Sequence, residues 1–144
     1  MYLQRIKNFL FSEPDTPTGY SIVLLIARIM FGTLFLWHGI AKWTTFYGET
    51  ENFPDPIGIG SALSFWLAIF AEVACSFGVI LGALFRLSLI PMIFTMCVAL
   101  FVIHGEDPLS VKEPALMYLT IFLLLFISGP GEFSIDKILR QIMG

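Results

Sequence analysis

Four long apolar runs constrain the fold more than any other feature of this sequence. They cover residues 20–43, 61–84, 86–104 and 114–128, and segments rich in glycine, proline and charged residues separate most of them. A helix that crosses the hydrocarbon core of a membrane needs about 20 mostly apolar residues, so three runs are long enough and the fourth is short. Because backbone polar groups cannot be left unpaired in lipid, we interpret all four as helices of one bundle.

The composition supports a membrane setting for these runs. The chain is 57% hydrophobic and only 13% charged, whereas about a quarter of the residues in a soluble domain are usually charged. We therefore predict an all-α membrane protein, a four-transmembrane-helix bundle with one domain over residues 1–144. The lipid bilayer is its expected partner, and we expect no nucleic-acid partner.

Both ends of the chain have the pattern of short amphipathic helices. After Ser134, which can cap a helix, apolar residues follow at spacings of three and four up to Ile142. Near the start, Leu3 and Ile6 alternate with basic and amide residues in the same way. We expect interfacial helices over about residues 2–11 and 134–143, lying on the membrane surface. The alternative is that these ends are frayed tails.

Basic residues near the ends of membrane helices predict orientation, because they are enriched in cytoplasmic segments. If both termini are cytoplasmic, that side holds Arg5, Lys7, Arg86, Lys137 and Arg140, and the outer side holds Lys42 and Lys112. We therefore expect both termini in the cytoplasm and residues 44–60 outside.

Two charges inside the apolar runs are expected to form a buried ion pair. At about 1.5 Å per residue, Arg28 lies roughly 12 Å above the inner end of its helix, and Glu72 lies roughly 16 Å below the outer end of the next. These depths are similar in a hydrocarbon core about 30 Å thick. Since an isolated charge in lipid is costly, pairing within the bundle would explain both residues.

A second polar group is expected at the outer rim of the bundle. His38 and Lys42 are four residues apart and share one helix face. The same rise brings His104 and Glu113 to a similar level. Imidazole exchanges protons near neutral pH, so we predict catalytic roles for His38 and His104 and ligand binding by Lys42 and Glu113. Alternatively, Lys42 extends to the interface and the histidines only satisfy helix ends. With no tight metal-ligand motif present, we expect no metal site.

Several motifs resemble the DoxX-like family of small four-helix bacterial membrane proteins. They are "ARIMFGTLFLWHGIAKW", "PIGIG", "LAIFAEVACSFGVILGALFR", "FVIHGED" and "EPALMYLTIFLLLFISGPGEFSID". The resemblance covers about residues 27–136 and implies a location in the bacterial cytoplasmic (inner) membrane. Carried onto this chain, it points to Arg28, His38, Gly39, Lys42, Glu72, Arg86, His104 and Glu113. Some relatives are described as membrane subunits of thiosulfate:quinone oxidoreductase, which implies a subunit of a membrane oxidoreductase.

Three functional hypotheses follow. The first is a redox-associated membrane subunit that binds a quinone or a small sulfur compound in the outer polar pocket, with no covalent cofactor. The second is a non-enzymatic scaffold or assembly factor that docks a protein partner on its outer side. The third is a small transporter, which would have to act as a homo-oligomer because four helices leave little room for a pathway.

Overall fold

A computed structural model of the chain describes residues 2–11 and 16–143, and all the regular structure within them is helical. The expected spans are present, and each is long and apolar enough to cross a membrane: α2 (Thr18–Phe46), α3 to α4 (Ser61–Leu81), α5 with its continuation (Phe85–Ile103) and α6 (Leu109–Ser128). The predicted all-α fold with four transmembrane helices is therefore confirmed.

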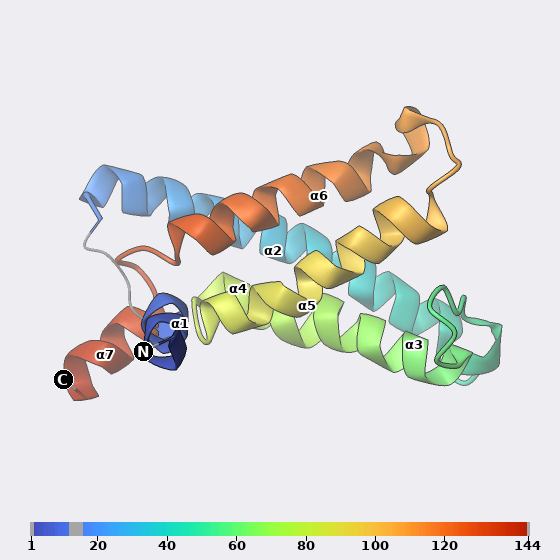
Figure 1. The fold of residues 1–144 in the computed structure, drawn as a ribbon, viewed down its shortest axis with the longest axis horizontal. Coiled ribbons are helices and arrows are strands. Elements are labelled where there is room, and N and C mark those ends of the chain that lie inside the picture. Colours follow the sequence, from blue (N-terminus) through green and yellow to red (C-terminus); the bar gives the residue numbers. More distant parts are fainter. Residues whose placement is uncertain (1, 12–15, 144) are drawn as a thin grey trace.

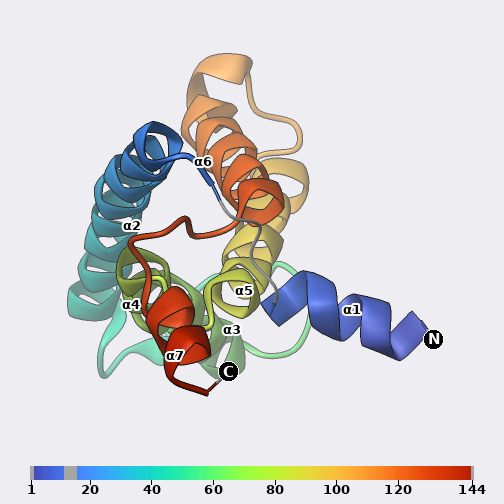
Figure 2. The same ribbon diagram turned by 90° about the vertical axis from the view of Figure 1, so that its left-hand side faces the viewer.

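The four spans pack side by side as an antiparallel bundle (Figures 1 and 2). α2 contacts α4, α4 contacts α5, α5 contacts α6, and α6 contacts α2. We call one end of the bundle the loop end, because residues 47–60 and 104–108 connect the spans there. The opposite end, which carries α1 (Tyr2–Phe11), α7 (Ile135–Met143) and the turn before α5, is called the terminal end.

Helix α6 begins earlier than the apolar run predicts. The sequence places its start at Pro114, but the first helical residue is Leu109, which follows Pro108 at the N-cap. Proline has a backbone angle suited to the start of a helix, so either proline could mark the start, and the first of them does. Pro114 lies inside the helix instead. The extra residues give α6 a length of 20, enough to span the hydrocarbon core.

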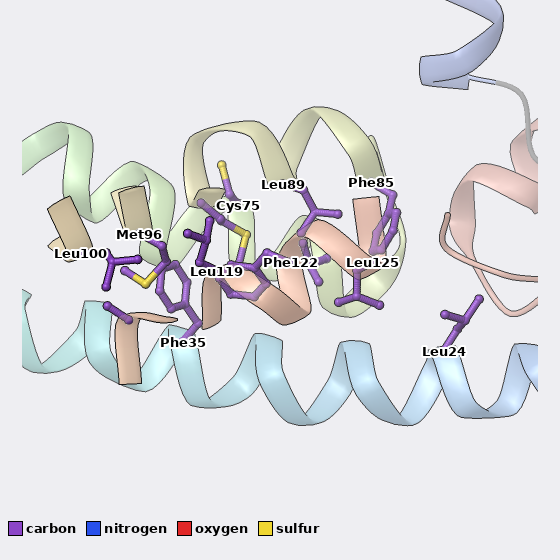
Figure 3. Close-up of a cluster of buried hydrophobic side chains, with 13 residues drawn as sticks. Leu24, Phe35, Cys75, Phe85, Leu89, Met96, Leu100, Leu119, Phe122 and Leu125 are labelled. Carbon is purple, nitrogen blue, oxygen red and sulfur yellow. The ribbon is translucent and has the colours of Figure 1, made fainter. Parts of the chain in front are cut away.

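A cluster of buried apolar side chains forms the core between the four spans (Figure 3). Phe35 of α2 and Phe122 of α6 are fully buried there, with ring centroids 4.9 Å apart in a T-shaped contact. Many other large apolar side chains of the spans are exposed, including Ile26, Leu34 and Ile127. In lipid these exposed side chains need no cover, which agrees with the membrane prediction.

The two terminal helices form as the sequence predicts. α1 contacts the bundle near α5 and projects from it, with Leu3 and Ile6 exposed (Figure 2). α7 is strongly amphipathic and also exposes apolar residues, among them Ile138 and Ile142. Exposed apolar stripes on helices at one end of a membrane bundle are typical of segments that lie in the interface.

At the terminal end, Arg28 is buried and holds two segments of the chain together. Its guanidinium donates hydrogen bonds of 2.6–3.0 Å to the backbone carbonyls of Val79, Ile80, Pro130 and Phe133. The first two carbonyls belong to the last turn of α4, where backbone N–H donors become scarce, and the Val79 carbonyl also accepts the N–H of Gly82 at 3.2 Å. Gly82 ends α4 in the left-handed conformation, and a Cβ there would lie 2.8 Å from the Arg28 Nη2 atom.

Two further side chains complete this end of the bundle. Arg86 Nε donates to the carbonyl of Phe126 in the last turns of α6. The Asp136 carboxylate accepts the backbone N–H groups of Leu84 and Phe85 at the start of α5, at 2.8 and 2.9 Å. A carboxylate at a helix start stabilises it by about 1 kcal/mol. The "GPGEFSID" motif is thus part of the packing of the terminal end.

Candidate functional site: two cavities that meet at Lys42

A polar cavity of about 260 Å³ lies near the loop end of the bundle. It lies between α2, α6 and the two spans opposite them. Its lining residues are Phe35, His38, Lys42, Glu72, Met96, Ala99, His104, Val111, Pro114, Ala115 and Tyr118. The structure therefore brings three of the four predicted rim residues, His38, Lys42 and His104, to one cavity. Their predicted chemical roles stay predictions.

Helical periodicity explains which side chains line this cavity. α2 contributes positions 35, 38 and 42, and α6 contributes positions 111, 114, 115 and 118. Spacings of three, four and seven residues place side chains on one face of a helix. Glu113 is not on the α6 stripe, and its side chain is exposed. The structure therefore does not bring Glu113 into the cavity.

Glu72 lies at the deepest polar point of the site, in a π-helical turn, η2 (Phe70–Ala74). Its side chain is fully buried, and its Oε1 atom accepts a hydrogen bond from Lys42 Nζ in a salt bridge. A second π-helical turn, η3 (Ala99–Ile103), ends just before His104. Such turns often occur at functional sites.

The predicted Arg28–Glu72 ion pair is wrong. In the structure Glu72 forms a salt bridge with Lys42, and the Arg28 guanidinium donates hydrogen bonds to backbone carbonyls at the terminal end. Depth counted from the helix ends misjudged the register between α2 and the next span. That register is fixed by close packing at Gly39, where a Cβ would lie 2.8 Å from the Glu72 Cβ atom. Lys42, three residues beyond Gly39, then reaches the carboxylate, and Arg28 lies three turns away on α2.

His104 is oriented by an acidic residue close to it in the chain, Asp107. Its Nδ1 atom is 2.7 Å from Asp107 Oδ2, and both side chains are partly exposed. A partner on one ring nitrogen determines which tautomer is present and how the ring is turned. The sequence predicts Glu113 as the carboxylate of this polar group. Asp107, three residues after His104, is the carboxylate that contacts the ring in the structure.

His38 makes its aromatic contact with a residue of α6. Its ring and that of Tyr118 are perpendicular, with centroids 5.7 Å apart. Tyr118 is half-buried and also contacts Phe35 and Phe122, so it connects the cavity to the core. The sequence offered one signal for this residue: it lies one turn after Pro114, on the same helix face.

A second cavity, which we call the apolar cavity, lies on the other side of Lys42. Its volume is about 460 Å³, and it extends between α3 (Ser61–Ile69), α5 and the loop of residues 53–59. Apolar side chains dominate its lining, including Phe70, Phe94 and Ile103, which are also exposed on the outside of the bundle. Lys42, Met96 and Ala99 line both cavities. The two spaces are therefore neighbours that share a wall with a charged group in it.

The loop over the apolar cavity is fixed by Asp55. Its carboxylate accepts hydrogen bonds from the N–H groups of Gly60 and Ile59 at 2.8 and 3.0 Å, and from the Ser64 hydroxyl at 2.9 Å. The bond from Gly60 is the main cause that lowers the pKa of Asp55 below its ordinary value. Asp55 therefore stays ionised at neutral pH and ties the "PIGIG" backbone to Ser64 in the first turns of α3.

The site combines side chains that can exchange protons with an apolar lining. In residues 2–11 and 16–143, no group of three His, Cys, Asp or Glu side chains is arranged to hold a metal ion. The two imidazoles, the phenol and the Lys42–Glu72 pair can donate, accept and exchange protons with a small oxygen-bearing ligand. Together, the fold and these cavities define a multi-pass helical membrane protein with an ionisable site within its span.

The comparison with known proteins places this chain in a family. The DoxX family model matches residues 23–105, and the chain belongs to the DoxX family. It is 35% identical to the inner membrane protein YqjF of Escherichia coli over 124 residues, which are 82% of this chain and 92% of that protein. It is 27% identical over 132 residues to an uncharacterized protein of Haemophilus influenzae, with 86% and 87% of the two chains covered. No solved structure matches the chain significantly.

Proposed function

We propose that this protein is a redox-associated subunit of the bacterial inner membrane that binds a quinone at the loop end of its bundle. The observation that carries the proposal is the shared wall of the two cavities at Lys42. A quinone has a ring with two carbonyl oxygens and a long hydrocarbon tail. The polar cavity offers hydrogen-bonding groups for the ring, and the apolar cavity offers a hydrocarbon surface for the tail.

The charges of the site favour a quinone over a small sulfur anion such as thiosulfate. The positive charge of Lys42 is already balanced by Glu72, and Asp107 adds a further carboxylate beside His104. An anion entering the polar cavity would meet little net positive charge. A neutral molecule avoids that cost, and the apolar lining of the neighbouring cavity is typical of binding sites for small lipophilic ligands.

Electrons would have to come from a partner protein, because the sequence has no motif for haem, flavin or an iron–sulfur cluster. The loop end is the place for that partner, since acidic side chains are exposed there, including Glu49, Glu51 and Glu106. They would attract a basic surface on the partner. A protein partner at the loop end is therefore part of the proposal, and so is assembly of the chain into a homo-oligomer.

The location and orientation belong to the same proposal. The relative named as an inner membrane protein supports a location in the bacterial inner membrane. The skew of basic residues toward α1, α7 and Arg86 supports cytoplasmic termini. Both cavities would then open toward the outer half of the membrane.

The quinone proposal is tested by ligand-dependent stability of the purified protein. A short-chain benzoquinone is expected to raise the melting temperature, because a ligand that binds only the folded state stabilises it. His38→Ala and His104→Ala should abolish this rise while leaving the melting temperature without ligand nearly unchanged, since neither side chain is deeply buried. Differential scanning fluorimetry in detergent measures both quantities, and organic extraction of the purified protein tests for bound quinone.

The matched control is Thr45→Ala, which removes an exposed hydroxyl that bonds only to the carbonyl of Ala41 in its own helix. This variant should respond to the quinone as the wild type does. If thiosulfate raises the melting temperature and the quinone does not, the ligand is a sulfur compound. If neither compound has an effect and no quinone is extracted, the scaffold hypothesis replaces the proposal.

Orientation is tested by labelling single cysteines from outside intact cells. In a background with Cys75 and Cys97 replaced by alanine, Glu51→Cys should react with a membrane-impermeant maleimide, and Gln141→Cys should react only after the cells are opened. Both positions are exposed, so accessibility to reagent depends on sidedness. The reverse labelling pattern would place the cavities on the cytoplasmic side and contradict the proposed orientation.

A further inference from the structure

The two oxygens of the Glu72 carboxylate have different surroundings. Oε1 accepts a hydrogen bond from Lys42. Oε2 is buried and is the one such side-chain N or O atom, within the described part of the chain, that no protein group hydrogen-bonds. The Glu72 side chain is fully buried and lines the polar cavity. One oxygen of this carboxylate is thus taken by the protein, and the other lacks a protein donor in a residue that lines the polar cavity.

An acceptor of this kind is rare in proteins. At least about 90% of buried polar groups have a hydrogen-bond partner, so an exception calls for a reason. The cost is higher for a carboxylate in the membrane-spanning part of a bundle, where water cannot replace the missing donor freely. Glu72 cannot turn away easily, because the backbone of η2 is in close contact with Gly39. The packing of α2 therefore holds the carboxylate at this wall of the cavity.

The other polar groups around the cavity are arranged differently. His104 is engaged by Asp107 on one ring nitrogen. His38 and Tyr118 contact each other through their rings. Lys42, the one lysine or arginine among the described lining residues, is engaged with Oε1. A ligand in the cavity therefore meets, at its buried wall, an acceptor that needs a donor.

We infer that Glu72 Oε2 accepts a hydrogen bond from a hydroxyl group of the ligand, so that the site prefers the dihydroxy form of a quinone, the hydroquinone, over the quinone itself. This inference rests on the proposed function and specifies which form of the ligand is bound. A hydroquinone presents an O–H donor to the carboxylate. A quinone presents only carbonyl oxygens, which would place two acceptors against each other and leave Oε2 desolvated and unpaired. A hydrogen bond to a charged group changes affinity by roughly 10- to 100-fold.

The test compares three ligands that differ only in the ring oxygens. A decyl hydroquinone, its dimethyl ether and the matching quinone are titrated anaerobically into the wild-type protein in detergent, with binding followed by calorimetry. The hydroquinone is expected to bind at least about tenfold more tightly than the other two, since neither of them can donate a hydrogen bond. The dimethyl ether keeps the ring and tail but cannot be oxidised to the quinone without losing its methyl groups, so oxidation during the titration cannot mimic the result.

Glu72→Gln is the variant that addresses the assigned atom. The amide keeps the shape and the acceptor for Lys42 but places an N–H donor where Oε2 lies. The preference for the hydroquinone over the quinone should disappear or reverse in this variant. Glu113→Gln makes the same chemical change on an exposed residue outside the cavity and should keep the wild-type preference.

The outcomes separate this inference from the proposed function. If the wild type binds the hydroquinone and its dimethyl ether equally, Glu72 does not select a donor, although the quinone site stands. If Glu72→Gln keeps the full wild-type preference, another residue makes the selection. If none of the three ligands binds, both proposals fail. The comparison of ligands on the wild type decides the inference even if the variant does not fold.

Discussion

Replacing Arg28 with alanine is expected to lower the free energy of unfolding by about 3–5 kcal/mol, one of the two largest effects we expect in this protein. The guanidinium is buried and donates to four backbone carbonyls on two separate segments. Leaving a buried acceptor without its donor costs about 1–3 kcal/mol, and these carbonyls lose the guanidinium together, with the Gly82 N–H remaining as a donor to the Val79 carbonyl. Arg28→Lys should also be costly, because an ammonium group cannot reproduce the planar geometry of a guanidinium.

The measurement is unfolding of the purified protein by a denaturing detergent, followed by helical circular dichroism. Thr33→Ala is the matched control, because Thr33 is exposed on the same helix and should change stability by less than about 0.5 kcal/mol. Ligand affinity per folded molecule should be unchanged in Arg28→Ala, since neither cavity is lined by this residue. A variant that is as stable as the wild type but fails to bind ligand would show that Arg28 belongs to the site after all.

The fold of this chain was predictable from its sequence because the requirement for it is local. A run of about 20 apolar residues must be helical in lipid, and each run carries that information by itself. The ends of the helices were less predictable: α2 extends to Phe46, three residues beyond the expected end, through residues that include two threonines. The position of a helix end depends on which terminal backbone groups have hydrogen-bond partners, and the apolar content of the sequence does not indicate these partners.

Partners of the buried charges were not predictable in the same way. Arg28, Glu72 and Lys42 are charges within or beside the apolar runs, and each has hydrogen-bond partners in the structure. Matching Arg28 to Glu72 required the register between two helices to within about one turn, or roughly 5 Å. That register is determined by Gly39, whose small size lets the two helices approach. The family resemblance points to Gly39, but its contact with Glu72 cannot be derived from the spacing of residues in the sequence.

In the candidate site, too, some features were predictable from the sequence and others were not. The face of α2 that carries His38 and Lys42 was predictable from their spacing of four residues. The approach of His104 was predictable from depth, because it lies at a helix end. The contact between Asp107 and His104 was not predictable, because it depends on the turn after η3. The apolar cavity was not predictable either, because it depends on how the 53–59 loop covers the helices.

The Lys42–Glu72 pair leads to the second large prediction, which concerns an asymmetry between its two members. Lys42→Met should lower the free energy of unfolding by about 3 kcal/mol, because it leaves a fully buried carboxylate without its cation. Glu72→Gln should cost less, about 1 kcal/mol, because the lysine that remains is about one-third exposed and can still reach water or the amide oxygen. Methionine and glutamine keep the volumes of the two side chains nearly constant, so the comparison isolates charge.

The double variant provides the decisive measurement. Lys42→Met combined with Glu72→Gln has no buried charge left to neutralise, so its loss of stability should be smaller than that of Lys42→Met alone, with a coupling energy of about 1–3 kcal/mol. Detergent unfolding of the wild type, both single variants and the double variant completes the cycle. Lys112→Met serves as control, because the Lys112 ammonium donates to the carbonyl of Gly105 at the loop end. Additive losses, or a Glu72→Gln variant as unstable as Lys42→Met, would mean that the pair is not coupled across the wall between the two cavities. Coupling of the expected sign would instead mean that any ligand which draws Lys42 away from Glu72 has to supply a donor in its place.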